Sequence, residues 1–371
     1  MNRLHEPTAS PDSMNLLRSL LFFALLLAEL PAVWACAICA PGAEQPSLRQ
    51  QLRAADVVVL ARLAAAGGTY SVAHLIKGDL PKGPIRLAVA PSDAQLRSSP
   101  DEALLYRLGD AGWQRAGALS AARADWVRQL MALPDPVDPT PAQWLARLGF
   151  FVAGLEDPQA LLAEVAYAEM ASAPYASLRA MAHRLDAGRL MLWLDRPELK
   201  LRRPLYALLL GFVGQNAVAS FLQQRMAGLR DPADMPSLSA MLAALIEIQG
   251  ADGVQWLERH YLSGPLSRDE LVPASLLALS VHGSDGQRVS QARVVQAYRY
   301  FVDQPTALAG LVASDLGNWS RWEFAPAFAQ WLRSGRPQSF TSRYAMVFYL
   351  MRSPRADARL ALESLRAEGL L

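Results

Sequence analysis

The C-terminal part of this chain is built from one short amphipathic segment after another, with no strand-like segment between them. From Ala142 to Leu371, apolar residues recur at helical spacing in about fourteen segments, each of the usual length of a globular helix. Prolines stand at or near several helix starts, where their fixed φ costs little. They are Pro158, Pro197, Pro232, Pro305 and Pro354. Short consecutive helices joined by brief turns must lie antiparallel, so the pattern predicts stacked helical hairpins.

This array of helices resembles the HEAT-type repeat proteins, whose helical pairs run about 40 residues and often lack a readable consensus. The resemblance covers residues 142–371 and implies an α-solenoid, in which each hairpin packs on the next. A globular all-α bundle is the competing interpretation, because the prolines are unevenly spaced and no residue pattern recurs cleanly. The helices that begin at prolines favour the solenoid.

The segment from Asp56 to Leu119 has a different pattern, that of short β-strands. Runs of β-branched and apolar residues alternate with turn residues, and they predict five strands in a small barrel or sandwich. The predicted strands are DVVVLARL, TYSVAHLIKG, PIRLAVAP, LLYRL and WQRAGAL. A short lead-in helix over Pro46 to Ala55 precedes them, because its leucines recur at helical spacing.

A connecting helix and a proline-rich stretch separate the two patterns. The stretch from Pro134 to Pro141 cannot continue a helix, because proline lacks the N–H and clashes with the preceding turn. We therefore expect an α+β multidomain protein that is mostly α. A small, five-stranded, β-barrel-like domain covers residues 36–120, the connecting helix and linker cover 121–141, and an α-solenoid of antiparallel helical hairpins covers 142–371.

Residues 1–35 have the pattern of an export signal. Arg18 supplies the positive charge, Leu20 to Leu30 the apolar core, and Val33-Trp34-Ala35 the cleavage site. The apolar core of roughly 11 residues is shorter than the ~20 that a membrane-spanning helix needs, and no later apolar run reaches that length. The sequence therefore predicts a cleaved signal peptide, no spanning segment in the mature chain, and a periplasmic or secreted protein of a Gram-negative bacterium.

Cleavage after Ala35 would leave Cys36 as the first residue, with Cys39 as the second of two cysteines in the chain. A c-type haem is excluded, because Ala40 stands where histidine is required. In an exported protein the pair can form a local disulfide, whereas a bacterial lipoprotein would be anchored by a lipid on Cys36. Redox or metal chemistry at the two thiols is a further alternative. The histidines show no paired ligand spacing, so we predict neither a metal site nor a cofactor.

The β-rich segment also resembles a known module. The order CAICAP, ADVVVLARL, YSVAHLIKGDLP and IRLAVAP is similar to the netrin-like module, the OB-type barrel of the tissue inhibitors of metalloproteinases. The resemblance covers residues 36–119. In that family the cysteine exposed by signal cleavage chelates the zinc of the target protease, and by position this role would fall to Cys36. The family begins Cys-x-Cys and has further disulfides, whereas Cys36 and Cys39 can pair only with each other.

Polar and aromatic residues of the helical part are candidates for a partner-binding surface. They are Tyr167, Glu169, Arg203, Tyr206, Trp319 and Trp322. The two tryptophans are three residues apart, so on a helix they would share a face and form a binding hot spot. The alternatives are ion pairs between helices or solvated faces for the first four residues. For the tryptophans, the alternative is burial in the seam between two hairpins.

Charge and motif content limit the classes of function that this chain can have. The 36 basic and 34 acidic side chains are interspersed, which argues against nucleic acid as a partner. The chain has no G-x-S-x-G, no Gly-rich phosphate loop and no H-E-x-x-H, so we predict no catalytic residue and no enzymatic activity. The favoured function is an exported, non-catalytic scaffold that binds a protein partner in the cell envelope. The alternative is a periplasmic protein that handles thiols or metals through Cys36 and Cys39.

Overall fold

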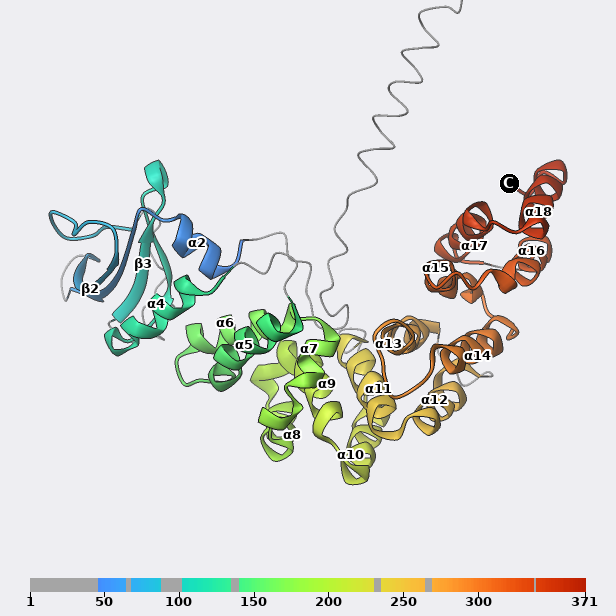
Figure 1. The fold of residues 1–371 in the computed structure, drawn as a ribbon, viewed down its shortest axis with the longest axis horizontal. Helices are drawn as coiled ribbons and strands as arrows, with labels where there is room; N and C mark the ends of the chain where they lie inside the picture. The colour runs from blue at the N-terminus through green and yellow to red at the C-terminus, as the bar shows by residue number, and fades with distance from the viewer. Residues whose placement is uncertain are drawn as a thin grey trace, which may run out of the picture. The chain divides into compact units, whose positions relative to one another are not determined.

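The structure is a computed structural model, which describes residues 46–64, 68–87, 102–134, 140–229, 235–263, 269–336 and 338–371. All of them belong to one compact unit. This unit is mostly helical, with a small antiparallel sheet near its N-terminal end and many helices after it (Figure 1). The strands are β1 (Val57–Leu63), β2 (Tyr70–Lys77), β3 (Glu102–Arg107) and β4 (Trp113–Ala118).

The sheet has the strand order β2-β1-β3-β4, and each neighbouring pair is antiparallel. The prediction of a five-stranded barrel is not confirmed, because the described sheet has four strands and is open. The fifth predicted strand forms only isolated bridges, from Ile85 to Tyr70 of β2 and from Leu87 to Trp113 of β4. Each contact is a single isolated bridge, so within the described residues this segment forms no continuous ladder with either edge of the sheet. Residues 88–91 of that prediction lie outside the described residues.

The two faces of the sheet belong to different hydrophobic clusters. On β1, Val58 and Leu60 join the large cluster that continues through the helices, whereas Val57, Val59 and Ala61 join a smaller one. Side chains alternate between the faces of a strand, which explains this division. Helix α2 (Leu48–Ala54), the expected lead-in helix, and α4 (Ala124–Ala132), the expected connecting helix, add side chains to the large cluster.

Fourteen α-helices, from α5 to α18, follow in the described residues, and each predicted helical segment overlaps with one of them. The proline-rich stretch ends in the first start signal: Thr140 and Gln143 form a capping box, with Pro141 as the first helical residue. The helices are α5 (Pro141–Phe151), α6 (Ala160–Ala171), α7 (Tyr175–Ala180), α8 (Ala187–Asp195), α9 (Arg203–Val213), α10 (Asn216–Ala227), α11 (Met235–Gln249), α12 (Ala251–Leu257), α13 (Val272–Ser284), α14 (Gln291–Val302), α15 (Ala313–Asn318), α16 (Ala325–Arg333), α17 (Phe340–Arg352) and α18 (Ala356–Ala367).

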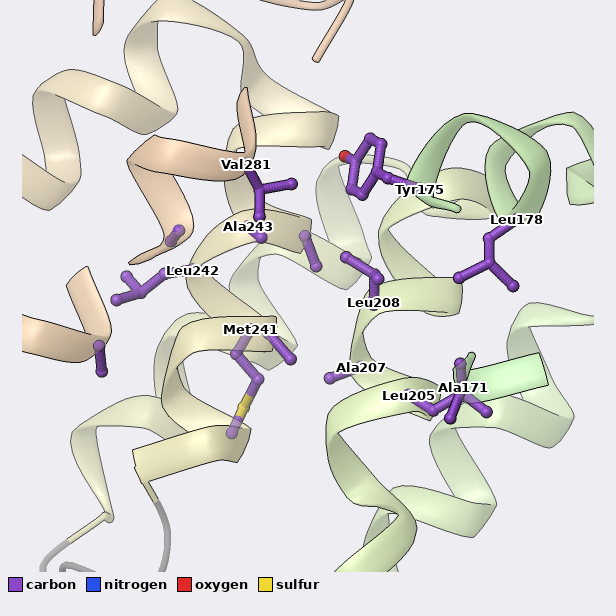
Figure 2. Packing of buried hydrophobic residues seen from close by; sticks show 14 of the residues in the cluster. Ala171, Tyr175, Leu178, Leu205, Ala207, Leu208, Met241, Leu242, Ala243 and Val281 are labelled. Carbon is purple, nitrogen blue, oxygen red and sulfur yellow. The ribbon is translucent and has the colours of Figure 1, made fainter. Parts of the chain in front are cut away.

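Helices contact their neighbours in sequence and also the helix after next. Contacts of the second kind link α5 to α7, α7 to α9, α9 to α11 and α11 to α13, and they recur between α15 and α17 and between α16 and α18. Figure 2 shows one such contact, with Leu208 on α9 near Met241 and Ala243 on α11. One hydrophobic cluster runs from Leu52 to Leu365, so the helices share a continuous core.

The close packing of α9 on α11 depends on Gly211, and we predict that Gly211→Ala lowers the free energy of unfolding. A Cβ at this position would lie 2.5 Å from Cα and 2.7 Å from Cβ of Ala244. Separating the two helices to admit a methyl group should cost about 2 kcal/mol, within the usual range for overpacking. Urea denaturation followed by circular dichroism measures the change.

The matched control for this prediction is Gly188→Ala, the same change at an exposed position in α8. A Cβ there would meet only the Asp186 carboxylate oxygen, at 3.3 Å. Because alanine is a better helix former than glycine, this variant should be as stable as the parent or up to about 1 kcal/mol more stable. Equal stabilities for the two variants would contradict the close contact between α9 and α11.

Candidate partner-binding site

The two cysteines singled out in the sequence, Cys36 and Cys39, lie outside the described residues. The disulfide, lipid-anchor, thiol and metal hypotheses for them stay predictions, as does the zinc-chelating role that the netrin-like resemblance implies. The other six candidate residues are all described, and the structure places them in five separate environments.

Tyr167 on α6 and Tyr206 on α9 pack edge to face, with ring centroids 6.4 Å apart. The guanidinium of Arg202 lies over the Tyr167 ring at 5.5 Å and donates to the Glu156 carboxylate at 2.8 Å. The Tyr206 hydroxyl donates a short hydrogen bond to the same carboxylate oxygen. Burial, reinforced by the charge of Glu156, raises the pKa of Tyr206. Tyr206 is fully buried, so this cluster joins α6, α9 and the turn at Glu156.

Glu169, also on α6, is buried and forms an ion pair inside the protein. Arg147 of α5 donates to its Oε2 from Nε at 2.9 Å and from Nη2 at 2.6 Å. The third nitrogen of Arg147, Nη1, donates to the carbonyl of Pro134 at 3.1 Å. Glu169 therefore fixes α5 to α6. Arg203 is in a different place: half-buried at the start of α9, it donates to the Arg196 carbonyl at 3.5 Å.

Trp319 and Trp322 do not lie on one helix. Helix α15 ends at Asn318, and Ser320 has a left-handed backbone conformation with φ 57°, so the chain turns between the two tryptophans. Trp319 stacks on Tyr298 of α14 with ring centroids 5.6 Å apart, and Trp322 packs on Tyr349 of α17 at 5.1 Å. Both are half-buried. Each tryptophan thus fills a seam between helices, which is the alternative that the sequence left open for them.

Helix α17 carries a row of exposed apolar side chains that the sequence patterns did not indicate as a site. We call Phe340, Tyr344, Phe348 and Met351 the α17 stripe; they are 84%, 63%, 45% and 60% exposed. The three rings stack along the helix, with centroids 6.4 Å apart for the first pair and 6.3 Å for the second. The spacing of four residues explains the stacking, because residues four apart lie on the same side of a helix.

The opposite face of α17 is part of the core. Its buried residues are Ser342, Met346, Tyr349 and Leu350. This face packs among α15, α16 and α18, and Ser342 accepts a hydrogen bond from the Gly310 amide at 2.8 Å. Helix α17 is therefore apolar on two opposite faces, and one of them has no partner within the described residues. The sequence signal for the stripe is a second series of residues spaced by four, at positions 340, 344 and 348. It is offset by two residues from the buried series at positions 342, 346 and 350.

Within the described ranges, no three side chains of the His, Cys, Asp or Glu type are placed to hold a metal ion. Nor does any helix in that part of the chain have the length and apolar character to cross a membrane.

Comparison with known proteins gives no match for this chain. No protein-family model fits it, and no curated protein or solved structure is significantly similar to it. The resemblances to HEAT-type repeats and to the netrin-like module thus rest on the residue patterns described above.

Proposed function

We propose that this protein is an exported, non-catalytic scaffold that binds a protein partner through the α17 stripe. The observation that supports this function best is the exposure of four large apolar side chains in one row. Together they expose on the order of 400 to 500 Å², which matches the largest patches of monomeric proteins, often functional ones. Aromatic residues and methionine are enriched in protein interfaces, and the polar side chains around them form the rim.

The packing of the helices supports a HEAT-like solenoid as the scaffold. Successive contacts between alternate helices, from α5 to α13, are what stacked hairpins produce. Such arrays offer extended surfaces, and the side chains exposed on them are free to meet a partner. Export to the periplasm or medium, with or without a lipid on Cys36, rests on the signal pattern of residues 1–35.

Site-specific photocrosslinking tests this function, with a photoreactive phenylalanine analogue placed at position 344 of the full chain in its native cells. We expect a protein adduct at this position, and none when the same analogue replaces Leu192, an isolated exposed residue of α8. In binding assays with the captured partner, Tyr344→Ala should weaken the affinity about 30-fold, as for a hot-spot residue. The Tyr344→Ala variant should be about as stable as the parent, because the Tyr344 side chain is exposed.

The alternative function, in thiol or metal handling, is tested by the same assay. The variant with Cys36→Ser and Cys39→Ser should capture the partner at position 344 as the parent does. If the double change abolishes capture while Tyr344→Ala leaves the affinity for the captured partner unchanged, the cysteines and not the α17 stripe perform the function.

A further inference from the structure

The charged residues of helix α17 have one sign. Helix α17 contains Arg343 and Arg352 and no acidic residue. With about 3.6 residues per turn, these arginines fall on opposite sides of the row of rings. The guanidinium of Arg352 lies 5.6 Å from the centroid of Phe348, so it borders the stripe directly. Arg352 donates to the side-chain oxygen of Asn318, and Arg343 to the carbonyl of Leu370; neither of these acceptors is charged.

The positive charge extends through the C-terminal segment. Residues 333–371 contain seven arginines against three acidic residues, a net charge of +4, whereas the whole chain has a net charge of only +2. Two of the acidic residues are already paired, Asp357 with Arg355 and Glu368 with Arg333. Together with Arg343 and Arg352 on the two sides of the stripe, this excess of positive charge favours a negatively charged partner.

We infer that the α17 stripe binds an acidic amphipathic helix of the partner protein, a conclusion that rests on the proposed function. The stripe runs from residue 340 to residue 351, about 17 Å along the helix axis, or three turns. Its rings form a ridge of side chains four residues apart, which fits the groove between the ridges of a second helix. The partner helix would place apolar residues three and four apart against the rings and carboxylates against Arg343 and Arg352.

A second copy of this chain is a less suitable occupant. In a two-fold symmetric contact between α17 helices, the same surface meets itself. Such a contact would bring the arginines of one copy against those of the other, with no acidic residue on either α17 to separate them. Like charges facing each other at an interface disfavour binding. The charge pattern therefore favours an acidic partner over self-association.

Two synthetic peptides test the inference directly with the full chain. Both are helices of about 18 residues with the same leucine positions, and they carry either glutamate or lysine on both sides of the apolar row. By fluorescence anisotropy at low salt, we expect the glutamate peptide to bind at least ~10-fold more tightly than the lysine peptide. Arg352→Glu should remove this preference or reverse it, and Tyr344→Ala should weaken the binding of both peptides.

Controls separate a specific effect from a general one. Arg128→Glu makes the same change of charge at an exposed position of α4 and should keep the preference for the glutamate peptide. Thermal unfolding shows that each variant is folded. Equal affinities of the parent for the two peptides, tighter binding of the lysine peptide, or no binding of either would overturn the inference.

Two further measurements identify the wrong occupant. The first is sedimentation of the protein with vesicles of equal parts phosphatidylcholine and phosphatidylglycerol. Vesicle binding that depends on Tyr344, together with equal affinities for the two peptides, would overturn the inference in favour of a membrane surface. If the parent protein is a dimer in solution and Tyr344→Ala makes it a monomer, the inference is overturned and the occupant of the stripe is a second copy of this chain. A protein adduct at position 344 without a charge preference leaves the proposed function standing and rejects the acidic helix. A charge preference of the peptides without any adduct at position 344 rejects the proposed function, and the inference about its partner helix falls with it.

Discussion

Glu169→Ala is expected to lower the free energy of unfolding by about 3 to 5 kcal/mol, because it leaves the buried guanidinium of Arg147 without its carboxylate. A second arginine makes the loss severe. Arg49 of α2 is 1% exposed and donates to the carbonyl of Leu133 at 2.8 Å. Burial and the nearby charge of Arg147 lower the pKa of Arg49, and Glu169 opposes this shift. Without Glu169, two buried cations would face each other. Urea denaturation of the full chain gives the change.

Two companion variants show whether the ion pair is responsible. Replacing both partners, as Arg147→Met with Glu169→Leu, should recover most of the loss, because apolar side chains of similar size need no counter-charge. Asp125→Ala removes an exposed ion pair with Arg128 and should leave stability unchanged within error. A loss for Glu169→Ala as small as that for Asp125→Ala would mean that water screens Arg147 and Glu169 from each other.

The helices were predictable from the sequence because their signals are local. Apolar residues at helical spacing, together with capping residues such as Thr140 and prolines such as Pro141, define each helix without reference to the rest of the chain. Four of the five predicted strands form, β1 to β4, and their signals are also local: apolar or alternating runs bounded by turn residues. The segment around Ile85 has an equally apolar run, but a strand needs a neighbour along its whole length, which the sequence does not reveal.

The environments of the candidate residues were not predictable, because they depend on pairing over long separations. Arg147 and Glu169 are 22 residues apart, and Arg49 and Leu133 are 84 apart. Spacing within one segment says nothing of such partners. The α17 stripe was missed for a related reason. Phe340 and Met346 are both apolar residues of one helix, and the helical period cannot tell which of two opposite apolar faces the other helices cover.

His282 is a buried histidine whose environment no sequence pattern predicts. It lies near the end of α13 and is 1% exposed. Its Nε2 is 2.8 Å from the carbonyl oxygen of Ala243, so this nitrogen holds the proton and donates it, while Nδ1 is buried with no hydrogen-bond partner in the described residues. A Cβ at Gly286 would lie 2.7 Å from Nδ1, so the backbone at Gly286 covers this side of the ring. The Tyr175 ring, which Figure 2 shows beside the contact of α11 and α13, covers another side at 5.8 Å.

This environment disfavours the charged imidazolium, and burial, with a smaller effect of Arg179, lowers the pKa of His282 to about 4. In the unfolded chain a histidine has a pKa of about 6.5, so acid protonates the unfolded state first. Stability due to neutral His282 is therefore complete above pH ~6.5 and is lost as the pH falls toward 4.

We expect the parent protein to lose about 2 kcal/mol more than His282→Gln between pH 7.5 and pH 5, measured by urea denaturation at each pH. Glutamine can donate to the Ala243 carbonyl as Nε2 does, but it does not titrate. Burial raises the pKa of Asp285 and of Asp315, which works in the opposite direction with pH, and both are present in the two proteins. The difference between parent and variant thus isolates His282. Parallel losses in the two proteins would show that His282 takes up its proton in the folded state as readily as in the unfolded one.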